Sequence, residues 1–286
     1  MNQTLFVSTE WLADRLGSTD LAIVDGSFFM PAEQRDARAE FAAGHIPGAV
    51  FFDIDAIADR STSLPHMLPS PEAFAAAAGK LGLSEGMTIV VYDNSDLVGA
   101  ARVWWTLRLF GAKEVKVLEG GLAKWRKEGR LLETGERLHK PRNFAAKLNR
   151  AGVAAAADVL KASEMATAQI VDARSAGRFT GEVAEPRPGL RSGHVPGSRN
   201  VPWPEVAAKG RVKPPEEVKA AFAKAGVDLS RPIITTCGSG VTAAILLLAL
   251  ESVGKQGVAL YDGSWSEWGG RLDLPIATGE AEDIAG

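Results

Sequence analysis

The segment best suited to chemistry is residues 237–242, which starts with the only cysteine among the 286 residues. Cys237 follows an apolar, β-branched run at 232–236, and the loop that it starts precedes a helical run at 243–250. Two glycines in the segment let the backbone curl so that successive N–H groups point inward as an anion-binding nest. The helix N-terminus adds partial positive charge, and both features favour a thiolate over a thiol. The sequence therefore predicts a nucleophilic cysteine whose loop can also hold a persulfide anion.

Each half of the chain alternates short β-branched runs with helical patterns, which is typical of a parallel sheet flanked by helices. The expected strands cover residues 21–24, 88–92, 115–118, 169–171, 232–236 and 258–261. The expected helices cover residues 71–80, 100–110, 215–225 and 241–252. In such α/β sheets ligands bind beyond the carboxyl ends of the strands, which is where Cys237 falls.

The two halves also repeat one another. Residues 22–25 are matched by 169–172, and the motif at 44–49 returns at 193–198. A repeat of this length indicates two tandem domains rather than a solenoid, whose units are far shorter. We therefore predict an α/β domain over residues 1–138, a polar linker over 139–152 and a second, catalytic α/β domain over 153–286.

The repeat provides an internal control for the cysteine. Aligning the strand patterns that precede them places Asp93 opposite Cys237, so the first domain keeps the scaffold without a nucleophile. His45 and His194 also occupy matching places in the two halves. A catalytic histidine would not be needed in the half without the cysteine, so we expect both histidines to be structural.

Composition narrows the classes of function. The net charge is −3 and no long basic run occurs, which argues against nucleic-acid or membrane partners. One cysteine permits neither an internal disulfide nor a cysteine-rich metal site. The sequence shows neither a secretory signal pattern nor an apolar stretch long enough to span a bilayer, so we expect a cytoplasmic protein.

The sequence resembles the tandem-domain rhodanese superfamily along nearly its whole length. The resemblance rests on the motifs at 44–49 and 193–198 and on the loop at 237–242. That loop is similar to that of the 3-mercaptopyruvate sulfurtransferase branch, whereas thiosulfate-using rhodaneses usually carry arginine or lysine there. Residues 238–241 are all uncharged. The resemblance implies transfer of sulfur from 3-mercaptopyruvate through a Cys237 persulfide to a thiol, thioredoxin-type or cyanide acceptor. Pyruvate would be released, with no metal or organic cofactor.

The resemblance also implies roles for other side chains. Arg178 and Arg187 would clamp the carboxylate and keto oxygen of the donor, which suits a planar guanidinium. Ser239, His66 and Asp55 would form a relay in which the carboxylate orients the imidazole and the imidazole passes protons through the hydroxyl. The loop residues expected to line the substrate are Gly238, Gly240, Val241 and Thr242.

Several of these assignments have alternatives. The two arginines could be surface charges or members of ion pairs, and His66 could cap local backbone. Asp53 competes with Asp55 for the place in the relay. Arg174 follows Asp172 closely, so we expect those two side chains to pair, and His139 in the linker has no assigned role.

The activity has alternatives too. The first is a thiosulfate sulfurtransferase with the same cysteine chemistry. The second is a non-catalytic persulfide carrier or interaction module. A phosphatase-like anion binder is the third, but the loop lacks the arginine that such enzymes place after the cysteine.

Overall fold

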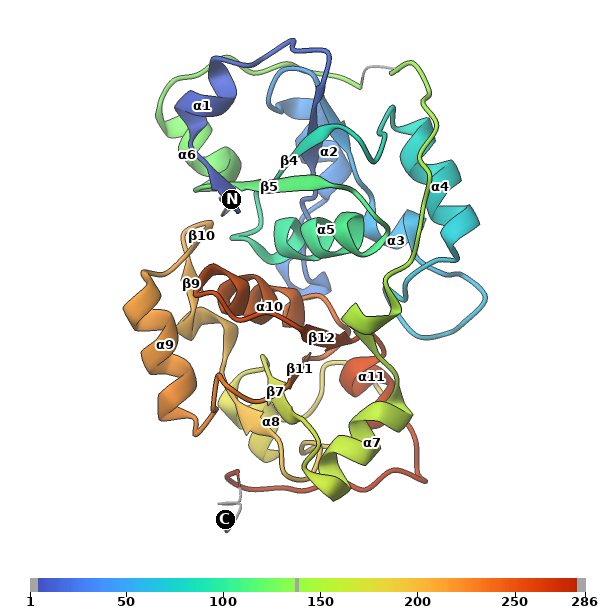
Figure 1. Ribbon diagram of the computed structural model, residues 1–286, viewed down its shortest axis with the longest axis vertical. Coiled ribbons are helices and arrows are strands. Elements are labelled where there is room, and N and C mark those ends of the chain that lie inside the picture. Colours follow the sequence, from blue (N-terminus) through green and yellow to red (C-terminus); the bar gives the residue numbers. More distant parts are fainter. Residues whose placement is uncertain (1–4, 137–138, 282–286) are drawn as a thin grey trace. The chain divides into compact units, whose positions relative to one another are not determined.

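The computed structural model describes residues 5–136 and 139–281 (Figure 1), so the predicted domain limits at 1, 138 and 286 lie outside its described part. The chain forms two compact units. The first comprises the chain up to Arg60, Leu68–Asn149 and Ala208–Arg211, and the second comprises Ser61–Met67, Arg150–Ala207 and the chain from Val212 onward. Most of the predicted linker groups with the first unit. The proposed domain boundaries themselves stay a prediction.

The first unit contains the five predicted strands and helices in the predicted order, together with seven further elements. Its elements are β1 (Phe6–Val7), α1 (Thr9–Ala13), β2 (Leu21–Asp25), η1 (Pro31–Glu33), α2 (Ala37–Ala43), β3 (Ala49–Phe51), α3 (Ile54–Ile57), α4 (Pro71–Lys80), β4 (Thr88–Tyr92), α5 (Val98–Leu109), β5 (Glu114–Leu118) and α6 (Gly121–Lys127).

The second unit repeats this alternation. Its elements are η2 (Arg150–Gly152), β6 (Val153–Ala154), α7 (Ala156–Met165), β7 (Gln169–Asp172), α8 (Ala176–Thr180), β8 (Arg199–Asn200), η3 (Trp203–Glu205), α9 (Pro215–Lys224), β11 (Ile233–Thr236), α10 (Ala243–Ser252), β12 (Val258–Tyr261) and α11 (Ser264–Trp268). Two short strands, β9 (Ala207–Ala208) and β10 (Arg211–Val212), pair separately.

Two five-stranded sheets with the same topology confirm the predicted fold class. Their strand orders are β1-β5-β4-β2-β3 and β6-β12-β11-β7-β8, and every pairing within them is parallel. The central strand of the first sheet, β4, thus corresponds to β11 of the second. This correspondence places Asp93 and Cys237 at matching strand ends, as the alignment of the repeats predicts.

Helices cover both faces of each sheet. In the first unit, Leu12, Phe41 and Trp125 pack from α1, α2 and α6 against one face, while α5 lies along β4 and β5 on the other (Figure 1). In the second unit, α7 and α11 cover one face and α10 packs on β11 and β12. Within the described ranges, no helix is both long enough and apolar enough to cross a membrane.

The two repeated histidines have matching structural contacts. The His45 ring stacks on Phe41 with 4.0 Å between centroids, and its Nδ1 lies 2.8 Å from the Phe41 carbonyl oxygen. The His194 ring stacks on Phe179 at 3.8 Å, and its Nδ1 lies 2.8 Å from the Phe179 carbonyl oxygen. Both side chains are buried. These contacts confirm that the pair is structural.

Candidate active site

The cysteine lies at the carboxyl end of the central strand β11, where a parallel sheet places its ligand site. Cys237 is a free, buried thiol with 2 % of its surface exposed. Residues 238–242 form the loop, and α10 starts at Ala243, where the helical run at 243–250 begins. Gly240 has φ of +75°, a left-handed conformation that glycine adopts without steric cost.

The first turn of α11 holds the cysteine loop in place. The Cys237 N–H donates to Ser264 Oγ at 3.2 Å, and the Trp265 N–H donates to the Cys237 carbonyl at 3.0 Å. Ser266 donates twice to the Gly238 carbonyl, from its N–H at 2.8 Å and its Oγ at 2.7 Å. The sequence analysis missed these two serines, because only the pairing of β12 beside β11 brings residues 264–266 to the cysteine. Their contacts pre-organise the loop before any donor binds.

The matching loop of the first unit shows what such a strand end can hold. The Asp93 carboxylate accepts hydrogen bonds from the N–H groups of Leu97 at 3.1 Å and of Gly99 and Ala100 at 3.0 Å, and from Ser95 Oγ at 2.7 Å. It is 2 % exposed. Burial raises the pKa of Asp93, and the four donors oppose that shift. The first unit therefore contains an anion cradle that its own carboxylate fills.

Arg178 lies directly against the cysteine loop. A Cβ added to Gly238 would fall 2.9 Å from Nη2 of the Arg178 guanidinium, closer than real Cβ contacts come. A larger residue at this position would require the tip of the Arg178 side chain to move. Residues 238–241 are uncharged, and the Arg178 cation that lies against them comes from α8.

Glu185 fixes the orientation of that arginine. Its carboxylate accepts from Arg178 Nη2 at 2.6 Å and Nε at 3.1 Å, and from Arg174 Nη1 at 2.8 Å. The Glu185 side chain is only 2 % exposed. Because Glu185 occupies the edge of Arg178 that includes Nε, the edge formed by Nη1 and Nη2 can still receive a second carboxylate. The sequence analysis did not single out Glu185, since no spacing rule links it to both arginines.

Arg174 has the structural role that the sequence analysis assigns to it. It donates to the Asp172 carboxylate from Nη2 at 2.6 Å and to the Gly193 carbonyl at 2.8 Å. Although burial lowers the pKa of Arg174, the carboxylates of Asp172 and Glu185 raise it above its ordinary value. In the first unit, Asp25 corresponds to Asp172 and Ser27 corresponds to Arg174. Because a serine stands in place of the guanidinium, burial raises the pKa of Asp25 to about 6.

Arg187 and His66 lie together. Arg187 Nη2 is 3.4 Å from His66 Nε2. His66 is 8 % exposed, has φ of +60° and belongs to the segment Ser61–Met67 that groups with the second unit. The sequence pairs His66 with a serine and an aspartate and gives no sign of its contact with Arg187, the second arginine of the predicted donor clamp.

The remaining members of the predicted relay fall in different units. Ser239 is 3 % exposed in the cysteine loop of the second unit, whereas Asp55 lies on α3 of the first unit. Asp53, the competing carboxylate, caps α3 by accepting from the Ala56 N–H at 2.9 Å. That capping contact gives Asp53 a structural function, and the relay through Asp55 stays a prediction.

Comparison with known proteins shows to which protein family the chain belongs. A family model described as "Rhodanese-like domain" matches residues 8–128 and 155–271, one match in each repeat. The chain belongs to the rhodanese family.

Named relatives cover the chain almost completely. A 3-mercaptopyruvate sulfurtransferase of Escherichia coli K12 is 49 % identical over 277 residues, which cover 96 % of this chain and 99 % of the relative. The human 3-mercaptopyruvate sulfurtransferase is 43 % identical over 269 residues, covering 92 % and 91 %. The crystal structure of SseA from Escherichia coli, a 3-mercaptopyruvate sulfotransferase, aligns with a TM-score of 0.86 at 46 % identity, covering 92 % of this chain and 99 % of SseA. The similarity thus extends over both repeats.

Proposed function

We propose that this sulfurtransferase takes its sulfur from 3-mercaptopyruvate and carries it as a persulfide on Cys237. The observation that carries the proposal is the pairing of an uncharged cysteine loop with an arginine that Glu185 presents to it from outside. A carboxylate-bearing donor suits that arrangement, because its anionic group can bind at the guanidinium while its sulfur reaches the loop. The names of the relatives in Escherichia coli and human agree with this donor.

The first half-reaction exchanges one bond for another. The Cys237 thiolate attacks the donor sulfur, an S–S bond forms, and the C–S bond breaks with its electron pair going to carbon. The product is the enolate of pyruvate, which takes a proton at carbon. Arg178 and Arg187 hold the donor in line, and this orientation lowers the entropic barrier to reaction. We assign the proton transfer to Ser239 with His66 and Asp55.

The negative charge of the persulfide must be stabilised by hydrogen-bond donors. The loop of the first unit binds a carboxylate with three amides and a hydroxyl at the end of the matching strand. We infer that the Cys237 persulfide is held in the corresponding way by the amides of Gly238, Gly240, Val241 and Thr242. In the second half-reaction an acceptor thiolate attacks the outer sulfur and the Cys237 thiolate leaves. Proposed acceptors are a thiol, a thioredoxin-type dithiol or cyanide, and ping-pong kinetics should follow.

A cytoplasmic location completes the proposal. The mechanism requires a free thiol, and the cytosol keeps thiols reduced.

The thiosulfate reaction is the competing proposal, and a curated relative in Arabidopsis thaliana, 42 % identical over 297 residues, is named for both donors.

Donor preference tests the proposal directly. Thiosulfate would find no cation within the loop itself, so we expect kcat/KM for 3-mercaptopyruvate to exceed that for thiosulfate by at least about tenfold, or 1.4 kcal/mol. Steady-state assays with one common acceptor measure the ratio. A higher kcat/KM for thiosulfate would overturn the donor assignment. If neither donor loads sulfur onto Cys237, the carrier-module alternative is favoured.

The His66→Ala variant tests the proton relay. General acid–base groups contribute about 10²-fold or more, so we expect kcat with 3-mercaptopyruvate to fall by about that factor and its pH profile to flatten. Because His66 also contacts Arg187, an effect on KM alone would indicate donor positioning instead. An unchanged kcat with an unchanged pH profile would remove His66 from the relay.

A further inference from the structure

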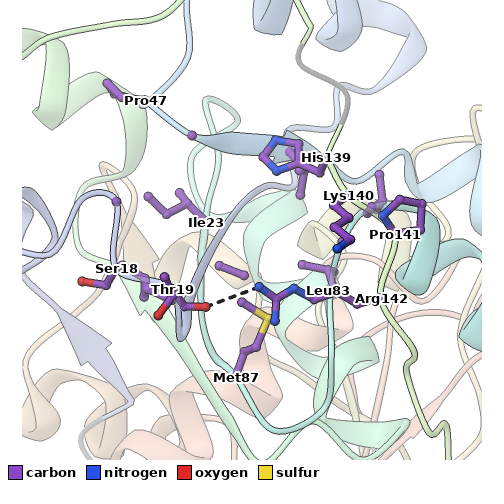
Figure 2. A pocket seen from close by; sticks show the side chains of 17 residues that line it. Ser18, Thr19, Ile23, Pro47, Leu83, Met87, His139, Lys140, Pro141 and Arg142 are labelled. Carbon is purple, nitrogen blue, oxygen red and sulfur yellow. Dashed lines mark hydrogen bonds between the residues drawn. The ribbon is translucent and has the colours of Figure 1, made fainter.

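A cavity of about 560 Å³ lies in the first unit (Figure 2), and none of the residues that line it is assigned to sulfur transfer. It opens beside the amino end of β2, where Thr19 and Ile23 contribute to its wall. Asp93 follows the carboxyl end of β4, which runs parallel to β2. The cavity is therefore at the opposite end of the sheet from the Asp93 cradle.

The lining combines positive charge with an apolar floor. His139, Lys140 and Arg142 supply the basic groups, and Ser18 and Thr19 supply hydroxyls. Among the described residues that line the cavity, none is acidic, although the chain as a whole carries net charge −3. The floor consists of buried apolar side chains, namely Ile23, Val50, Leu83 and Met87.

The basic side chains come from a segment that is docked on the helix beneath it. The Arg142 N–H donates to the Gly79 carbonyl at 3.0 Å, and a Cβ at Gly79 would fall 2.5 Å from the Arg142 carbonyl oxygen. At Gly82, where φ is +76°, a Cβ would lie 3.0 Å from that of His139. Two glycines at the end of α4 thus permit a backbone approach that other residues would block. The backbone that carries the three basic residues is consequently held in place by α4 and the residues after it.

The Arg142 guanidinium is also turned toward the cavity wall. It donates to the Thr19 carbonyl at 3.5 Å, a long and weak hydrogen bond that leaves most of its donors available (Figure 2). This contact differs from those of Arg35 and Arg174, each of which pairs with a carboxylate at 2.6 Å. An arginine and a lysine facing an acid-free cavity form an anion-binding arrangement.

We propose that this cavity is a second ligand site, which binds a small organic anion with an apolar body. The anionic group would meet Lys140 and Arg142, and the apolar body would cover Met87 and Leu83. A volume of this size is in the range of pockets that take small molecules. The site is independent of the sulfur-transfer proposal, since none of its residues takes part in that chemistry.

Methionine-methyl NMR on the full chain tests the site, with benzoate as the probe. The Met87 methyl is one of five methionine signals and is assigned with Met87→Leu. We expect benzoate to shift the Met87 signal saturably, and benzamide, its neutral analogue, to bind at least about tenfold more weakly. Two further probes, phenyl phosphate and inorganic phosphate, test whether the apolar body of the ligand is needed. Binding of phenyl phosphate without binding of inorganic phosphate shows that it is. Equal binding of the two probes overturns the claim that the ligand has an apolar body.

Matched variants locate the binding. The Lys140→Gln, Arg142→Gln double variant should weaken benzoate binding at least about tenfold, whereas Lys147→Gln, an exposed lysine on the same segment that does not line the cavity, should not change it. Equal binding of benzamide, or unchanged binding to the double variant, would overturn the proposal. Benzoate bound only by the arginines of the second unit would leave the Met87 signal unmoved, which also contradicts it.

Discussion

The Cys237→Ser variant should lose sulfur transfer by about 10⁴-fold or more, because a serine hydroxyl can neither form the persulfide nor leave from it. The substitution changes one buried atom, so the fold should persist, and a thermal unfolding curve checks this. Mass spectrometry after treatment with 3-mercaptopyruvate should find the wild-type chain one sulfur atom heavier and the variant unchanged. Since the chain contains a single cysteine, the adduct has only one place to form.

The internal repeat supplies the control for this experiment. Asp93→Cys in the Cys237→Ser background places a thiol at the matching strand end of the first unit. We expect no recovery of activity, because Arg178, Arg187 and Glu185 all belong to the second unit. Residual activity of Cys237→Ser within tenfold of wild type would remove the cysteine from the mechanism. Activity restored by Asp93→Cys would show that the loop alone, without the arginines, is sufficient.

Much of the fold could be predicted because each strand is short, apolar and bounded by clear turn signals. The strands β4 and β12 and the helix α4 have the predicted limits, and the structure shows that Ser70 caps α4 before Pro71. The α10 helix begins at Ala243, as the helical run at 243–250 predicts, whereas the longer candidate helix at 241–252 starts two residues too early. The apolar pattern indicates which side chains are buried, but it does not indicate where the loop before α10 ends.

The site could be predicted only in part, for a different reason. Cys237 has a local signature, since strand, glycine-rich loop and helix follow one another in the sequence. Ser264 and Glu185 act through tertiary contacts, one across two neighbouring strands and one between two arginines. No local pattern encodes such contacts. The position of the Arg178 guanidinium against Gly238 is likewise a tertiary contact that only the folded chain reveals.

Glu185 links the stability of the second unit to its donor site. Its buried carboxylate binds two guanidinium groups, so Glu185→Ala leaves both arginines with one carboxylate fewer. Breaking a buried ion pair by removing one partner costs about 3 kcal/mol, and we expect the free energy of unfolding to fall by that order. Arg174 retains Asp172, which should keep the unit folded.

Loss of Glu185 should also have a kinetic effect that reduced stability alone would not produce. Arg178 loses the partner that occupies its Nε edge, so its guanidinium is no longer oriented toward the cysteine loop, and KM for 3-mercaptopyruvate should rise about tenfold. The second half-reaction does not use the donor clamp, so the rate at which an acceptor removes sulfur from preformed persulfide should stay the same. Glu185→Gln keeps the shape and should give a smaller change, and Glu182→Gln, an exposed neighbour, should give none. If Glu185→Ala slows both half-reactions equally at unchanged KM, its effect is structural only, and Glu185 is not a positioning residue for Arg178.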